Sequence, residues 1–239
     1  MAEGDRHSQV GTSGRLSLTE DARRGIIRDA LGIAVATGAY ALSFGAISSA
    51  SGLSLLQTCA LSVLMFTGAS QFALVGVVGA GGSVWAGAAT AALLGSRNAL
   101  YGVRLSSLLD RTGWKRAAAA HFVIDETTAM AIARESVPES RCAFWATGLA
   151  LFALWNLGTL IGALATHALP DPKVLGFDAA PPAAFLALLA PRLHAREPLA
   201  IGLGAGVVAL VCLPFVPAGV PLLIVAVLVA IFGIVRSRR

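Results

Sequence analysis

The sequence predicts an all-α polytopic membrane protein with about eight transmembrane segments, and two observations lead to this fold class. Of the 239 residues, 56% are hydrophobic and only 13% are charged, whereas ordinary globular chains carry about 25% charged residues. Two stretches, residues 30–96 and 198–235, contain no Asp, Glu, Lys, Arg or His. Because one helical crossing needs roughly 20 apolar residues, we expect residues 26–236 to form a single transmembrane domain of seven or eight segments.

The expected segments follow from the apolar runs and the polar turns between them. The fourth and sixth are the least regular, because the fourth carries His121, Asp125 and Glu126 and the sixth carries Asp178 and two prolines. Such segments can be broken or re-entrant. The eight segments are expected at residues 29–50, 54–79, 83–109, 115–133, 142–168, 174–191, 198–213 and 217–236.

Polar residues flank this domain at both ends. Residues 1–25 lack the apolar core and the cleavage site of a signal peptide and are expected to form a polar cytoplasmic tail. Residues 237–239 are expected to form a basic cytoplasmic end. Ser17 followed by Glu20 fits a capping box, which predicts a short interfacial helix leading through Arg23 and Arg24 into the first segment.

The distribution of Lys and Arg predicts the orientation. If the N-terminus is cytoplasmic, that side receives twelve of these residues and the opposite side receives four. The positive-inside rule then places both termini in the cytoplasm. We expect the chain to be a multi-pass protein of the bacterial inner membrane. Arg111, Lys115 and Arg116 run against this pattern, because three crossings before them put them on the opposite side.

Composition and motifs exclude several other classes. The net charge is +5, yet no basic face is interleaved with exposed aromatic residues, so nucleic acid is not an expected partner. Cys59, Cys142 and Cys212 lie far apart in apolar runs and indicate neither disulfides nor a metal site. The sequence has no nucleotide-binding loop, metalloprotease motif or nucleophile elbow, so we expect no cofactor and no enzymatic activity.

The third segment carries polar residues at membrane depth, where charges are costly and therefore candidates for function. Arg97, Tyr101 and Arg104 share one helical face at i, i+4 and i+7, and Asn98 stands beside Arg97. Arg97 can clamp a substrate carboxylate while Tyr101 supplies a hydroxyl. The alternative is that Arg97 pairs with an acidic residue of the fourth segment and only fixes helix packing.

The acidic candidates lie in the fourth and sixth segments. Asp125 and Glu126 are adjacent, so on a helix their side chains point about 100° apart and cannot both face one site. We expect one of them to meet Arg97, while the other exchanges a proton or is hydrated. Asp178 is a further candidate for ion pairing or coupling.

The second segment carries neutral hydrogen-bonding groups that suit an amino-acid ammonium or carboxylate without burying a charge. They lie in residues 66–72, a stretch unfavourable for a continuous helix, as are residues 177–185 of the sixth segment. Interrupted helices at matching places suggest a two-repeat architecture and are typical of transporter sites. Tight packing alone is the alternative. The binding candidates in this segment are Thr67, Gly68, Ser70 and Gln71.

Five short motifs stand in order along the chain: FTGASQF at 66–72, LGSRNALYG at 94–102, DET at 125–127, WNLG at 155–158 and LGFD at 175–178. Together they resemble the motifs of the AzlC family of branched-chain amino acid permeases, over about residues 23–235. The resemblance implies the large subunit of an exporter for leucine, isoleucine, valine and sometimes methionine, driven by an ion gradient, with protons expected. It also implies a partner, a small hydrophobic AzlD-type membrane subunit.

The chain departs from the family pattern at two positions of the third segment. Gly95 stands where the family usually has Asn, and Asn98 stands where it usually has His. If that His handles protons in the family, this chain must do so differently, and its substrate preference can differ too. The competing interpretation is a structural or assembly subunit of the membrane that has no solute path of its own.

Overall fold

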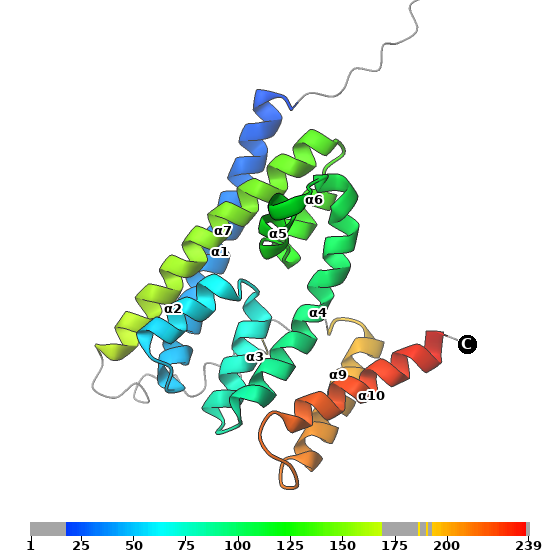
Figure 1. The fold of residues 1–239 in the computed structure, drawn as a ribbon. Coiled ribbons are helices and arrows are strands. Elements are labelled where there is room, and N and C mark those ends of the chain that lie inside the picture. Colours follow the sequence, from blue (N-terminus) through cyan, green and yellow to red (C-terminus); the bar gives the residue numbers. More distant parts are fainter. Residues whose placement is uncertain (1–17, 169–185, 187–189, 191–192, 238–239) are drawn as a thin grey trace, which may run out of the picture.

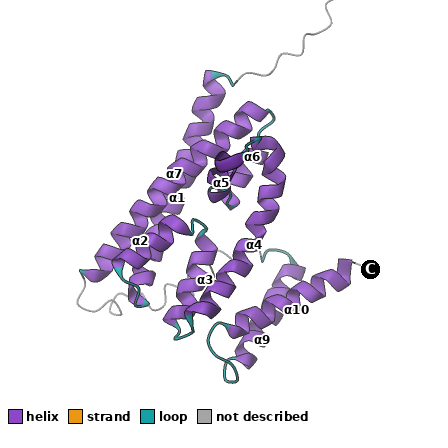
Figure 2. Cartoon of the chain, in the orientation of Figure 1, coloured by secondary structure: helices purple, strands orange, loops and turns teal. Residues whose placement is uncertain are grey.

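The computed structural model describes residues 18–168, 186, 190 and 193–237, and all regular secondary structure in these ranges is helical (Figures 1 and 2). The predicted all-α class is therefore confirmed for the described residues. The helices are α1 (Glu20–Ala50), α2 (Leu55–Leu64), α3 (Gly68–Gly79), α4 (Val84–Leu109), α5 (Gly113–His121), α6 (Asp125–Ile132), α7 (Val137–His167), α9 (Arg196–Cys212) and α10 (Val220–Ser237).

α1 begins earlier than the first predicted segment. Its N-cap is Thr19, whose hydroxyl accepts a hydrogen bond from the backbone N–H of Ala22 at 3.2 Å. Glu20 and Asp21 in the first turn interact favourably with the positive end of the helix dipole. The helix then continues unbroken, so the expected interfacial helix and the first segment are one element. Ser17, the expected cap, lies outside the described residues.

α1 and α7 run parallel and their backbones are in direct contact. A Cβ atom on Gly45 of α1 would overlap the carbonyl oxygen of Thr159 in α7. A Cβ atom on Gly162 of α7 would in turn overlap the carbonyl oxygen of Leu42 in α1. Glycines spaced four residues apart let two membrane helices approach this closely. Gly158 and Gly162 of α7 form such a packing motif, and it serves a contact within this chain.

The single crossing expected for residues 54–79 is corrected to a helical hairpin of α2 and α3. The chain leaves helical geometry at Met65 (φ −110°, ψ 61°) and returns to it after Thr67 (φ −157°, ψ 76°). Thr67 and the following Gly68 are residue types that favour a helix weakly. A Cβ atom on Gly79, the last residue of α3, would lie 2.5 Å from the hydroxyl of Ser51, which directly follows α1. The hairpin therefore begins and ends where α1 ends, which we call the distal end of the bundle.

Residues 115–133 also form a hairpin, of α5 and α6, and not one crossing. Arg134, just after α6, lies 3.0 Å from the carboxylate of Asp29 in the first part of α1. Arg141, near the start of α7, lies 3.8 Å from the carboxylate of Asp110, which directly follows α4. The chain thus enters and leaves this hairpin at the end where α1 begins, which we call the proximal end.

The two hairpins enter the bundle from opposite ends, and α4 connects them (Figure 1). This arrangement moves the connection between α4 and α5. Arg111, Lys115 and Arg116 were expected on the side opposite the N-terminus, but the structure places this connection at the proximal end. The physical reason is that a hairpin returns the chain to its starting end, whereas a crossing of the same length does not.

α9 and α10 form a helical pair next to the turn between α3 and α4. They agree with the predicted segments 198–213 and 217–236 as helices. A Cβ atom on Gly82 would lie 2.6 Å from the carbonyl oxygen of Ala218, so the α9–α10 turn touches the distal end. The sixth predicted segment (174–191) falls almost entirely outside the described residues. Asp178 and residues 177–185, the second half of the suggested repeat, lie wholly outside them.

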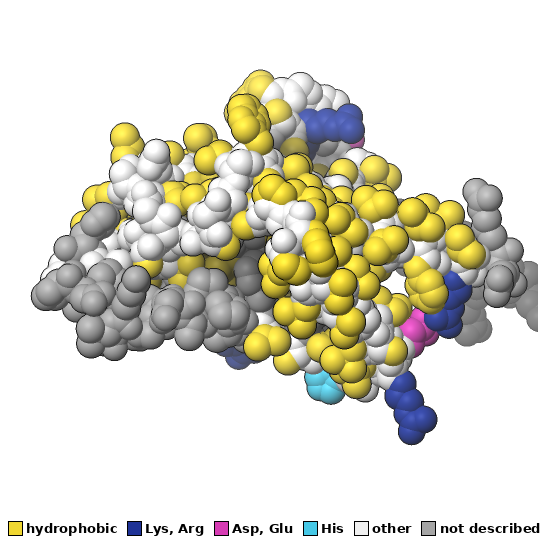
Figure 3. All heavy atoms as spheres, turned by 90° about the horizontal axis from the view of Figure 1, so that it is seen from below, with side chains coloured by type: hydrophobic (Ala, Val, Ile, Leu, Met, Phe, Trp, Pro, Cys, Tyr) yellow, Lys and Arg dark blue, Asp and Glu magenta, His cyan; other side chains and the backbone are white. Residues whose placement is uncertain are grey.

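The described surface suits a membrane. Two helices, Glu20–Ala50 and the segment Val137–Thr166 of α7, are long and apolar enough to cross a bilayer. α4, with 26 residues, is about 39 Å long and also exceeds the hydrocarbon core of roughly 30 Å. Hydrophobic side chains dominate the described part of the face in Figure 3, and cationic side chains are few there.

Candidate functional site

A glutamine side chain forms a hydrogen bond across the break between α2 and α3. The side-chain amide of Gln71, which is fully buried, donates a hydrogen bond to the carbonyl oxygen of Leu61 at 3.1 Å. Leu61 lies in the last turn of α2, and its carbonyl oxygen also accepts the backbone N–H of Met65 at 3.0 Å, so Gln71 supplies a second hydrogen bond to it. Gln71 was predicted to bind substrate, and here its donor group fixes the break. Its Oε1 atom has no hydrogen-bond partner among the described residues.

The break between α5 and α6 is held by a threonine. The hydroxyl of Thr127 accepts the backbone N–H of Ile124 at 3.1 Å and donates to the carbonyl oxygen of Phe122 at 2.6 Å. One buried side chain thus pairs with two backbone groups of the interruption, the N–H of Ile124 and the carbonyl of Phe122. Asp125 and Glu126 occupy the first turn of α6, where a helix dipole favours negative charge.

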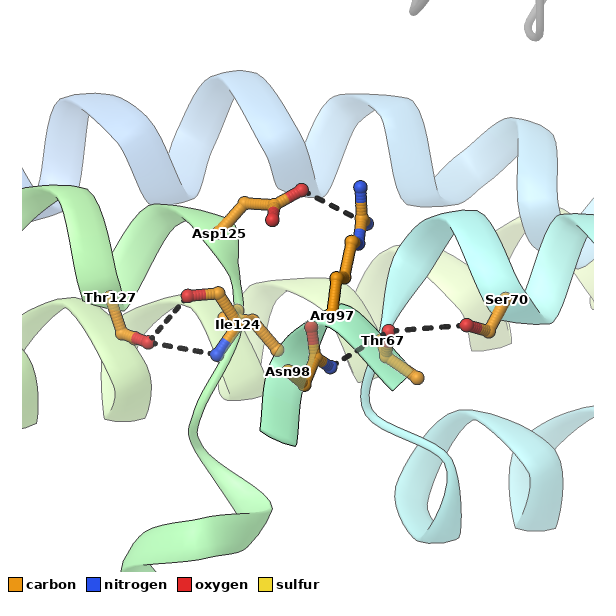
Figure 4. A network of polar contacts seen from close by, with 7 residues as sticks. All are labelled: Thr67, Ser70, Arg97, Asn98, Ile124, Asp125 and Thr127. Atoms are coloured by element: carbon orange, nitrogen blue, oxygen red, sulfur yellow. Dashed lines mark hydrogen bonds and ion pairs between the residues drawn. The ribbon is translucent and has the colours of Figure 1, made fainter. Parts of the chain in front are cut away.

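An ion pair connects α4 to the start of α6. The guanidinium of Arg97 lies 2.9 Å from the carboxylate of Asp125, and the two side chains point toward each other in Figure 4. Both are mostly enclosed, since the side chains are 29% and 31% exposed. Of the two adjacent acidic residues, one of which was expected to contact Arg97, Asp125 makes this contact. Glu126 forms no ion pair among the described residues.

A second contact connects α4 to the start of α3. The amide of Asn98 donates to the hydroxyl of Thr67 at 3.3 Å, and that hydroxyl is 3.5 Å from the hydroxyl of Ser70 (Figure 4). Gly95, one turn earlier on α4, faces the same group, because a Cβ atom there would lie 3.3 Å from the Ser70 hydroxyl. The structure therefore brings Asn98, which follows Arg97 in α4, together with Thr67 and Ser70 of the second segment.

Two buried polar atoms at this place have no hydrogen-bond partner within the described part of the chain: Arg97 Nε and Asn98 Oδ1. Buried polar atoms in proteins are nearly always paired. These two come from adjacent residues of α4, and the Oε1 atom of Gln71 is a third such atom at the hairpin they contact. The arrangement can accept hydrogen bonds from a polar solute and donate one to it.

Aromatic side chains enclose the start of α3 on two sides. Phe72 packs against Tyr40, with ring centroids 5.1 Å apart, and against Phe44 and Trp155 at 5.4 and 6.5 Å. The Trp155 ring also covers Gly68, since a Cβ atom at this glycine would lie 3.3 Å from it. A larger residue than glycine would therefore not fit here without moving the tryptophan.

On the other side, the tips of the two hairpins touch. Phe66 at the first break lies 6.0 Å from Phe122 and 6.0 Å from His121 at the second, measured between ring centroids. Phe152 of α7 contacts all three rings. The two interruptions thus meet in the interior of the bundle, although 55 positions separate Phe66 from His121 in the sequence.

Tyr101, the remaining predicted residue of α4, lies against buried apolar residues. Tyr101 packs against a separate buried cluster that includes Leu105 and Phe144, while Arg97 reaches Asp125. Tyr40, which packs against Phe72, was not among the predicted site residues, although Tyr40 and Tyr101 are the only tyrosines in the chain. Among the described residues no three His, Cys, Asp or Glu side chains lie close enough to hold a metal ion.

Comparison with known proteins gives two matches for this chain. The family model described as AzlC protein matches residues 32–169, which contain both hairpins and every described candidate residue. The inner membrane protein YgaZ of Escherichia coli (strain K12) is 30% identical over 184 residues, which cover 73% of this chain and 74% of that protein. No solved structure gives a significant match.

Proposed function

The chain belongs to the AzlC family, and from this premise we propose that it is a transporter subunit that exports branched-chain or similar apolar amino acids by secondary, proton-coupled transport. The observation that carries the proposal is the meeting of two broken helix pairs beside the Arg97–Asp125 ion pair. Transporters commonly bind solutes where interrupted helices expose backbone groups at membrane depth.

In this proposal α2–α3 and α5–α6 are re-entrant hairpins, while α1, α4 and α7 cross the membrane. Backbone groups that leave a helix within a bilayer need partners in the protein. Thr127 supplies such partners at the second break, and Gln71 adds a second hydrogen bond to the Leu61 carbonyl at the first. Each hairpin then separates the central site from one aqueous side, which is what alternating access requires.

The substrate carboxylate binds at the start of α3. The N-terminus of a half-helix carries partial positive charge and free backbone N–H groups. Thr67, Ser70 and Asn98 add neutral donors around it, and Arg97 adds a cation. The site can therefore hold an anionic group with both charge and hydrogen bonds, as the sequence predicted for these residues.

The other parts of an amino acid also find chemically suitable neighbours. Asp125 can exchange its contact with Arg97 for one with the substrate ammonium, and Glu126 beside it carries the coupled proton. The rings of Tyr40, Phe72 and Trp155 offer an apolar wall for a branched side chain. Such a site favours an apolar zwitterion over a charged amino acid.

A small AzlD-type subunit completes the transporter in this proposal. The packing motif at Gly158 and Gly162 is occupied by α1, so it is not the docking surface. A second glycine motif, Gly202 and Gly206 of α9, is mostly open, because a Cβ atom on Gly206 meets nothing within 4 Å and one on Gly202 meets only the side chain of Leu193. We expect the partner to contact α9.

A growth experiment tests this function. A bacterial strain without amino-acid exporters of this family should gain resistance to a toxic leucine analogue when this chain and a small AzlD-type subunit are expressed together. The chain alone should give no resistance. Full resistance from the chain alone contradicts the two-subunit proposal, and no resistance from the pair at normal abundance contradicts export.

The Arg97–Asp125 pair supports a second candidate function, an assembly subunit without a solute path. The two charges satisfy each other at 2.9 Å and can serve helix packing alone. In that case conservative variants of Arg97 that keep the charge should retain function. Transport of a substrate through the site predicts instead that such variants lose function.

A further inference from the structure

The proximal end carries a group of exposed cations between residues 104 and 116. Arg104 in α4, Arg111 after it, and Lys115 and Arg116 in α5 are all exposed. None of them forms an ion pair with a residue that the structure describes. The nearest carboxylate in sequence, Asp110, already faces Arg141 at 3.8 Å. We call Arg104, Arg111, Trp114, Lys115 and Arg116 the basic surface.

Apolar groups around these cations fix their depth in a membrane. Leu100 and Val103 of α4 are 73% and 74% exposed and flank Arg104, so this face of α4 suits lipid chains. Trp114 is 74% exposed, and the Lys115 ammonium lies 5.9 Å from its ring centroid. Exposed tryptophans gather at the boundary between lipid chains and headgroups.

Arg104 can reach the same boundary. It lies five residues before the last residue of α4, which is about 7.5 Å along the helix. The long arginine side chain can extend over this distance and place its guanidinium at the headgroups. The cations of α4 and of the α4–α5 connection therefore face one layer, the headgroup layer at the proximal end.

We propose that the basic surface binds the phosphate groups of anionic lipids. Clusters of Lys and Arg beside a transmembrane helix attract anionic headgroups. The exposed apolar residues next to the cations favour a lipid over a soluble anion, because a lipid also supplies acyl chains for them. This inference depends on the placement of the α4–α5 connection and on membrane insertion, and it does not depend on what the protein transports.

The test measures binding of phosphatidylglycerol to the purified full chain in a neutral detergent. The variant R111Q/K115Q/R116Q removes three cations of the basic surface. The control R23Q/R24Q/R28Q removes three exposed cations of α1 at the same end, so both proteins have the same net charge. All six side chains are exposed, so melting temperatures should stay near that of the parent.

We expect binding of phosphatidylglycerol to weaken at least roughly tenfold in the first variant and less than about threefold in the control. Phosphatidylcholine and inorganic phosphate should not compete at equal concentration. Equal losses in both variants, or no loss in the first, would overturn the proposal. Competition by inorganic phosphate would show a soluble-anion site and overturn it as well. Export by the variants is not part of the readout, so a failure here leaves the proposed function untouched.

Discussion

The guanidinium of Arg97 lies 2.9 Å from the carboxylate of Asp125, and this pair joins α4 to the tip of the hairpin α5–α6. Removing one partner of an enclosed ion pair leaves a charge that the protein cannot solvate well. The ammonium of a zwitterionic substrate can take the place of Arg97 beside Asp125. Its carboxylate can take the place of Asp125 beside Arg97. The pair is therefore both a structural contact and a suitable place for a zwitterion.

The variant Arg97→Lys separates these two roles. Lysine keeps the positive charge but loses the planar guanidinium with its two parallel donors. We expect the free energy of unfolding to change by about 1 kcal/mol or less, because the contact with Asp125 can persist. Export of leucine should fall at least roughly tenfold, which corresponds to about 1.4 kcal/mol of lost transition-state stabilisation. Parental export by an abundant Arg97→Lys protein would favour the packing role.

The hydrogen bond from Gln71 to Leu61 predicts a loss of stability when the amide is removed. Gln71→Ala should lower the free energy of unfolding by about 1 to 3 kcal/mol, because the Leu61 carbonyl loses one of its two hydrogen bonds and the fully buried side chain leaves a cavity. Gln57, which is exposed and caps α2, is the matched control, and Gln57→Ala should cost less. Thermal unfolding of both variants in detergent measures the difference. Equal melting temperatures would contradict the assigned role of Gln71 at the break.

The contact between α1 and α7 predicts opposite effects for two glycines of the same helix. Gly45→Ala should lower the free energy of unfolding by about 1 to 3 kcal/mol or more, because the added methyl group overlaps the backbone of Thr159. Gly32→Ala should stabilise it by about 0.5 to 1 kcal/mol, since nothing lies within 4 Å and alanine favours a helix. Melting temperatures and yields of the two proteins provide the comparison. Similar behaviour would show that α1 and α7 do not pack in this way.

The hairpins predict which loops share a side of the membrane. In a protein whose native cysteines are replaced, Thr112→Cys and Ala80→Cys should react with an impermeant maleimide from opposite sides. Thr112 lies in the connection before α5, and Ala80 lies in the turn after α3. Thr112 should share its side with a tag at the N-terminus. Labelling of Thr112 from the side opposite the N-terminal tag would contradict the assignment of α2–α3 as a hairpin.

The apolar character of the segments and the positions of the long helices could be predicted from the sequence, but the division of two segments into short helices that turn back could not. Residues 54–79 have the same hydropathy whether they cross once or return after a break, because hydropathy reports burial in lipid and not direction. The weak helix formers at Thr67 and Gly68 marked the interruption. Only the contact of Gly79 with Ser51 reveals that the chain turns back.

The candidate site was predicted in its residue types and only partly in its contacts. Arg97 and Asp125 were candidates because charges are rare in the predicted segments, and that argument needs no structure. The side-chain amide of Gln71 donates to the Leu61 carbonyl, which lies ten residues earlier on the other side of the break. The sequence does not show at which residue this break begins. Tyr40 carries no local signal, because its neighbours in α1 are ordinary helix residues.

The most direct test of the central claim is efflux of radiolabelled leucine from preloaded cells. Cells should be compared with and without this chain, each in the presence of a small AzlD-type subunit. We predict that efflux requires the chain, slows when the proton gradient is collapsed, and is lost in an abundant Arg97→Lys variant. Efflux at the same rate in cells that lack the chain would contradict the proposal that it forms the path for the amino acid.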